Sequence, residues 1–73
     1  MDERARVVCH EIRVRGRLGD TLLGAFPGLR AQANGADTVF TGELPDQAAL
    51  HGVLAQIEAL GLELLELHCG RPR

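Results

Sequence analysis

Residues 45–61 are the stretch of this sequence whose structure the amino acids come closest to dictating. Asp46 can accept hydrogen bonds from amides of a first helical turn, and Gly61 can take the left-handed conformation that ends a helix. Between them, large apolar residues recur with the spacing of a helix that buries one face: Leu50, Val53, Leu54, Ile57 and Leu60. The sequence therefore predicts a helix over residues 46–60, and the rest of the chain must supply a surface for its apolar face.

Residues 7–15 carry the alternating pattern of a strand with one buried face. The alternation predicts one face made of Val8, His10, Ile12 and Val14 and an opposite face made of Cys9, Glu11, Arg13 and Arg15. Residues 62–69 are a compact run between glycines, too short for a second long helix, and we interpret them as the last strand.

A hairpin is predicted in the middle of the chain. Strands over residues 29–33 and 36–44 flank Asn34-Gly35, a dipeptide that tolerates the positive φ angles of a type I′ turn. This turn would place Leu29 opposite Phe40 and Ala31 opposite Thr38. Before the hairpin, Asp20 or Thr21 can start a helix of about two turns that ends at Pro27.

The order strand, short helix, strand, strand, long helix, strand indicates an α+β fold. It is the order of a ferredoxin-like βαββαβ sandwich, with a four-stranded antiparallel sheet, helices on one side and a short first helix. We expect residues 1–6 to be a frayed N-terminus, residues 7–69 a single domain and residues 70–73 a C-terminal tail. The short first helix would leave part of the core uncovered, at a place where a partner could dock. The alternative is that Phe26 and Leu29 fill this gap.

Composition narrows the choice of partner and compartment. The 73 residues carry a formal charge of −2, which does not suit a general nucleic-acid binder. The N-terminal residues lack the apolar run of a signal peptide, and no segment approaches the roughly 18 apolar residues of a membrane span. We expect a cytoplasmic protein that binds neither nucleic acid nor membrane. In that compartment Cys9 and Cys69 are expected to be free thiols.

The pairs Cys9-His10 and His68-Cys69 are candidate metal ligands, since zinc prefers cysteine and histidine. Strand alternation divides the four side chains between the two faces of the sheet, which opposes a four-ligand site. Cys9 and His68 are then the pair that shares the outer face. The alternative is that Cys69 is a small buried apolar residue and His68 a solvated one, and no cofactor is expected.

A turn rich in glycine precedes the short helix and consists of Gly16, Arg17, Leu18, Gly19 and Asp20. Glycines before a helix allow backbone amides to approach an anion, so Gly16, Arg17, Gly19 and Asp20 are candidate ligand-binding residues. Asp20 would place a carboxylate where a phosphate should sit, and two glycines three residues apart commonly mark a simple turn.

Convergent catalytic groups are hard to find in this sequence. The chain has no serine, lysine or tyrosine, and His10, His51 and His68 fall on different elements. An enzyme usually needs a concave pocket lined by polar groups that converge. We therefore expect no catalysis by a lone subunit, while a pocket between two subunits stays open.

The outer face of the long helix carries small residues. Ala48, Gly52, Ala55 and Ala59 form a stripe opposite the large apolar residues, and His51 lies beside it. Small residues allow another backbone to approach closely, so these five positions are the candidate partner-binding surface. The alternative is that alanine is simply the best helix former, but this does not explain Gly52, which costs about 1 kcal/mol relative to alanine.

Four segments resemble a group of small stand-alone bacterial proteins of uncharacterised function. They are residues 11–16 (Glu-Ile-Arg-Val-Arg-Gly), 38–42 (Thr-Val-Phe-Thr-Gly), 46–54 (Asp-Gln-Ala-Ala-Leu-His-Gly-Val-Leu) and 60–62 (Leu-Gly-Leu). The likeness spans residues 10–68. It departs at His10, where those proteins have an aromatic residue, and near residues 22–26, where they have a longer segment with a tryptophan. The resemblance implies a compact single domain and no particular activity.

Our leading hypothesis is a small non-enzymatic interaction or regulatory domain that pairs with itself as a homodimer or with another protein. One alternative is a sensor of small ligands, similar to amino-acid-binding regulatory domains, that uses the turn at Gly16 to Thr21. A further alternative is a metal-binding protein that uses cysteine and histidine.

Overall fold

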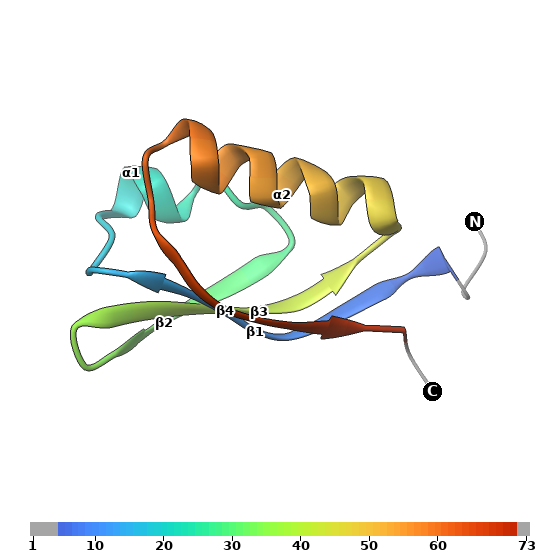
Figure 1. The fold of residues 1–73 in the computed structure, drawn as a ribbon, viewed down its shortest axis with the longest axis horizontal. Coiled ribbons are helices and arrows are strands. Elements are labelled where there is room, and N and C mark those ends of the chain that lie inside the picture. Colours follow the sequence, from blue (N-terminus) through green and yellow to red (C-terminus); the bar gives the residue numbers. More distant parts are fainter. Residues whose placement is uncertain (1–4, 72–73) are drawn as a thin grey trace.

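Four strands form one antiparallel sheet, and a long helix lies across one of its faces (Figure 1). The computed structural model describes residues 5–71. Its elements are β1 (Val7–Arg15), α1 (Asp20–Leu23), β2 (Leu29–Asn34), β3 (Asp37–Leu44), α2 (Gln47–Ala59) and β4 (Leu64–Gly70). The strand order is β2-β3-β1-β4, so β2 and β4 are the two edges of a small α+β domain. Among the described residues, no helix is long and apolar enough to cross a membrane.

The helix predicted from residues 46–60 is confirmed as α2. The side chain of Asp46 accepts a hydrogen bond from the amide of Ala49 at 2.8 Å, and Gly61 takes a φ of +74° after the last turn. Leu50 and Ile57 are buried against the sheet, whereas Leu60 is 36% exposed. The predicted burial of the apolar face is therefore confirmed at Leu50 and Ile57, whereas Leu60, at the C-terminal end of the helix, is partly exposed to solvent.

The predicted alternation of β1 is wrong over its first half, because the strand contains a β-bulge. Pairing with β3 shifts between Cys9 and Ile12, and an extra residue in one strand reverses which side chains face inward. Four side chains of β1 are consequently buried on the face that α2 covers: Val7, Cys9, Ile12 and Val14. His10 is exposed, and the inward set begins at Val7 rather than Val8.

The hairpin forms, but its turn lies one residue further along than predicted. Asn34 pairs with Asp37, so the two turn residues are Gly35 and Ala36. Of these two, Gly35 alone takes a positive φ, of +62°, which excludes the type I′ turn centred on Asn34-Gly35. Phe40 therefore pairs with Ala31 instead of Leu29.

The prediction of a ferredoxin-like βαββαβ sandwich is wrong, because the helices do not form its two-helix layer. Among the described residues, α2 is the one helix of more than a single turn on the covered face of the sheet, and α1 adds only a short turn beside it, with Leu23 partly buried against the core (Figure 1). α1 is one turn of four residues with no buried side chain. Glycine stands at both of its ends, Gly19 as an N-cap without a side-chain hydrogen bond and Gly24 as the C-cap, and so short a helix has little stability of its own.

The ends of the predicted domain fall partly outside the described residues. Residues 1–4 of the predicted frayed N-terminus and residues 72–73 of the predicted tail belong to those parts. Within the described part, Arg6 forms an ion pair with Glu43 at 3.2 Å, and Gly70 is the last residue of β4.

Candidate functional site

A groove of about 420 Å³ runs between α2 and the segment that follows α1. One wall comes from α2 and the other from the segment between α1 and β2, and the end of β3 closes the groove. Its lining consists of Ala25, Phe26, Pro27, Leu44, Pro45, Ala49, Gly52, Val53 and Gln56. Gln56 is the one residue of this lining with a polar side chain, so the groove is an apolar surface.

The groove exists because α1 ends early. Gly24 terminates the helix, and Phe26, from the segment that follows, fills the core that a longer helix would cover. The Phe26 ring lies 4.8 Å from the ring of Phe40, centroid to centroid, and is only 2% exposed. Phe26 thus seals the core beneath, while the space beside α2 stays open.

The predicted partner-binding residues are exposed, but the groove includes just one of them. Ala48, His51, Gly52, Ala55 and Ala59 all lie on exposed positions of α2. Gly52 alone lines the groove, and a Cβ added there would meet no atom within 4 Å. The groove uses the flank of α2 formed by Ala49, Gly52, Val53 and Gln56 rather than the outer stripe.

Sequence reasoning missed the second wall of the groove. The lining residues that were not predicted are Ala25, Phe26 and Pro27, with Leu44 and Pro45 at the end of β3. The available signal was the short first helix, which predicted an uncovered part of the core. What the sequence could not provide was the position of that opening relative to α2.

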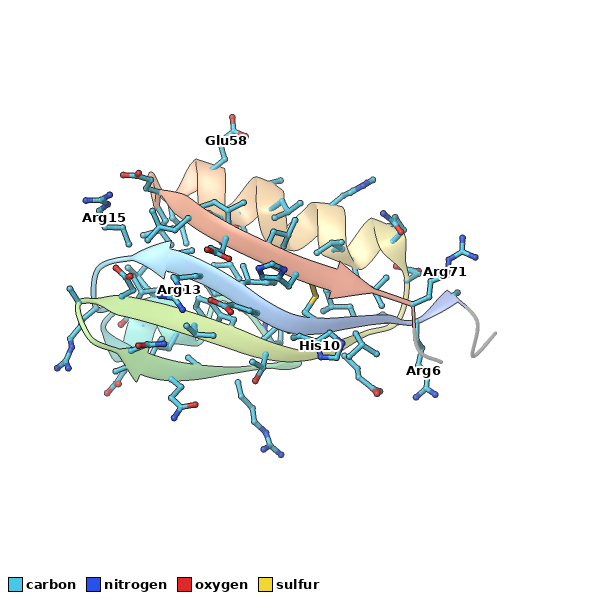
Figure 2. The ribbon with its side chains drawn as sticks, turned by 60° about the horizontal axis from the view of Figure 1, so that its bottom comes forward. Arg6, His10, Arg13, Arg15, Glu58 and Arg71 are labelled. Atoms are coloured by element: carbon cyan, nitrogen blue, oxygen red, sulfur yellow. A yellow bond between two sulfur atoms is a disulfide. The ribbon has the colours of Figure 1, made fainter. Side chains whose placement is uncertain are left out.

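Cys9 and Cys69 form a disulfide, so the prediction of free thiols is wrong. The bulge turns Cys9 inward, and the register pairs it directly with Cys69 at a Cα–Cα distance of 4.1 Å. Figure 2 shows this bond joining β1 to β4. The predicted metal ligands Cys9 and His68 are not brought together, because Cys9 is buried while His68 lies exposed beside Glu66.

The face of the sheet away from α2 carries charged side chains of β1 and β4, and Figure 2 shows Arg13 and His10 on it. His68 Nε2 lies 2.7 Å from Glu66 Oε2, and Arg13 Nε donates to Glu11 Oε2 at 2.7 Å. The hydrogen bond from Arg13 to Glu11, followed by the negative charge of Glu11, raises the pKa of Arg13 above its ordinary value. Arg13 therefore stays a cation bound to Glu11.

Glu11, Glu66 and His68 present donor atoms within 4.8 Å of one another on that face. This spacing could suit a cation, but the three groups are at least partly exposed and already have protein partners. The cluster is thus explained by ion pairing within the sheet.

The glycine turn lies at a second, smaller hollow of about 230 Å³ near β2. Arg17 lines it and donates a hydrogen bond to the carbonyl oxygen of Gly35, at 3.2 Å. Thr38, also in the lining, donates to the carbonyl oxygen of Gly16 at 2.8 Å. Gly19 and Asp20 are exposed at the start of α1 and do not line the hollow. The polar groups of this turn are therefore used to hold the turn itself.

Fold and groove together define a small α+β domain with one apolar surface groove and a disulfide that joins the first and last strands. Residues 9–68 match the family described as Domain of unknown function (DUF8691). The match covers most of the chain, and the protein belongs to this family. No curated protein and no solved structure shows significant similarity to the chain.

Proposed function

We propose that the chain is a small non-enzymatic protein-interaction domain, and that the groove beside α2 binds an apolar segment of another protein. The observation that carries this proposal is the lining of the groove, which has eight residues without a polar side chain and one glutamine. A small-molecule site is also mostly apolar but has a few placed polar groups that orient the ligand, and an active site needs titratable groups as well. This lining offers one polar side chain, that of Gln56. An apolar surface with one polar group suits the apolar side chains of a bound protein segment, such as a helix, whose backbone groups form hydrogen bonds within the segment itself.

Gly52 supports the same proposal. Glycine inside a helix costs about 1 kcal/mol relative to alanine, and the packing of the domain does not require it, because a Cβ at this position meets open space. Because Gly52 has no side chain, the backbone of α2 is accessible from the groove at this position. A bound segment can then approach the backbone of α2 closely.

Site-specific cross-linking in cells tests the proposal. A photo-reactive amino acid at Gln56, in the groove, should cross-link a discrete partner protein, and one at Arg30, exposed on β2, should not. Combining the Gln56 probe with Gly52→Arg should remove the cross-link, because the long side chain fills the groove. Gly52→Ala is the matched control, since it also replaces the glycine with a good helix former but adds little volume, and it should preserve the cross-link.

Two results contradict the proposal. One is a cross-link of equal yield from positions 56 and 30, which indicates non-specific contact. The other is a cross-linked partner that persists in Gly52→Arg, which shows that the partner lies outside the groove.

A further inference from the structure

The large apolar side chains that stay exposed in the described residues all lie between residues 60 and 67, at the end of α2 and in the edge strand β4. Three leucines are the large apolar residues that stay exposed between residues 5 and 71: Leu60 at 36%, Leu64 at 40% and Leu67 at 39%. Leu64 and Leu67 belong to β4, and Leu60 caps the C-terminus of α2 just before the loop into β4. All three therefore belong to one connected segment at one edge of the sheet.

β4 is also an edge strand without a neighbour on its outer side among the described residues. Its seven residues contain no proline and no lysine, residues that commonly prevent edge strands from pairing. Pairing with β1 shifts between Arg13 and Val14, which makes Leu65 a bulge, and the stretch of β4 from Glu66 to Cys69 contains no further bulged residue. The disulfide to Cys9 fixes β4 to the sheet, so the backbone groups on the outer side of β4 are held in the extended conformation that strand pairing requires. The opposite edge, β2, has no large exposed apolar residue.

We infer that β4 pairs antiparallel with β4 of a second copy of this chain, to give a continuous eight-stranded sheet in a homodimer. Antiparallel pairing of two identical edges is related by a two-fold axis, which makes the interface self-complementary. Both copies then carry α2 on the same face of the sheet. With Leu67 at the two-fold axis, the two Leu67 side chains meet on that face, and Leu64 and Leu60 lie farther from the axis.

Charge selects the register of this pairing. Residues directly opposite in antiparallel strands share a face, so the strands can shift only in steps that keep inward residues opposite inward residues. A register centred on Glu66 would oppose two carboxylates, and one centred on His68 would oppose two imidazoles. A register centred on Leu67 places Glu66 opposite His68 of the partner subunit, which is the favourable arrangement.

The same charge pattern already operates within one subunit. In the pairing of β1 with β4, Arg13 lies opposite Glu66 and Glu11 lies opposite His68. The register centred on Leu67 extends this alternation of basic and acidic groups across the new strand pair. Leu67 itself pairs with Leu67 of the partner subunit, on the face that also carries Ile12.

This inference goes beyond the proposed function and does not involve the groove, so either can fail alone. Sedimentation equilibrium of the oxidised full chain should give twice the monomer mass of 7.9 kDa at sufficient concentration. Leu67→Lys places two cations at the centre of the pairing and should weaken dimerisation by at least tenfold. Gly52→Arg, in the groove, should leave dimerisation unchanged. Circular dichroism checks that each variant is folded.

A charge exchange tests the register. Glu66→Arg and His68→Glu should each weaken self-association by roughly tenfold, because each loses or reverses both cross-strand pairs. Mixed together, the two variants should form a heterodimer at least as tight as the wild-type dimer. In that heterodimer the introduced arginine faces the introduced glutamate, and the remaining native histidine faces the remaining native glutamate. Native mass spectrometry separates the heterodimer from both homodimers by mass.

A monomer at all concentrations would overturn the inference. So would a dimer that is insensitive to Leu67→Lys, or a mixture of the two charge variants that associates no better than either alone. A dimer disrupted by Gly52→Arg would place the interface on α2 and contradict pairing at β4.

Discussion

A methyl group added at Gly42 would meet backbone atoms, whereas one added at Gly52 would meet open space. Gly42 lies in β3 with a φ of +151°, and a Cβ there would lie 2.6 Å from the carbonyl oxygen of Gly28. Backbone atoms of this kind cannot move aside as the end of a side chain can. Gly52 lies on the exposed flank of α2, where a Cβ meets no atom within 4 Å.

Gly42→Ala should lower the free energy of unfolding by roughly 2–4 kcal/mol, through the clash and the unfavourable φ together. Gly52→Ala should raise it by up to about 1 kcal/mol, because alanine favours the helix. Urea unfolding followed by circular dichroism measures both changes. Equal effects of the two substitutions would contradict the difference in packing described for these sites.

At the scale of the element, the start of α2 was predicted correctly from the sequence, whereas the alternation of β1 was not. The start of α2 depends on one local contact, the hydrogen bond from the amide of Ala49 to the carboxylate of Asp46. A local contact of this kind can be predicted from neighbouring residues. The bulge in β1 depends on pairing with β3, and no residue type or pattern within β1 predicts it.

Asp46→Ala should lower the free energy of unfolding by about 1 kcal/mol, since an amide of the first turn of α2 loses its acceptor. Asp46→Asn is the matched control, because its amide oxygen can accept the same hydrogen bond. Thermal unfolding followed by circular dichroism compares the two. A loss of stability in Asp46→Asn as large as that in Asp46→Ala would show that charge, not the hydrogen bond, is responsible.

At the scale of the whole molecule, the disulfide links residues 60 positions apart and closes nearly the entire chain into a loop. A domain of this size buries only about 60% of the surface that its unfolded chain exposes, so its core supplies limited stability. A bond that restricts the unfolded chain therefore has a large relative effect.

Replacing both cysteines, Cys9→Ala with Cys69→Ala, should lower the free energy of unfolding by roughly 2–4 kcal/mol. Adding a reductant to the wild-type chain should lower its stability in the same direction. The double variant itself should not respond to the reductant, which makes it the control. A wild-type urea midpoint that is the same with and without reductant would contradict a stabilising disulfide.

The amino-acid sequence by itself determined the elements whose signals are local. The helix α2 follows from its apolar spacing, the cap at Asp46 and the turn at Gly61. The existence of the strands follows from alternation in residues 7–15, from the turn signal at Asn34-Gly35 and from the compact run before Gly70. A first helix shorter than α2 was also predicted, because glycine and proline act on their immediate neighbours, but its two predicted turns are a single turn of four residues in the structure.

Tertiary structure alone decided the features that depend on contacts between distant residues. The bulge turns Cys9 inward and so allows a disulfide where alternation predicted cysteines on opposite faces. The path of Phe26 into the core reduces α1 to a single turn, which removes the two-helix layer and opens the groove beside α2. These outcomes required the strands to pair and the core to close, and their free energies arise from residues that are far apart in the sequence.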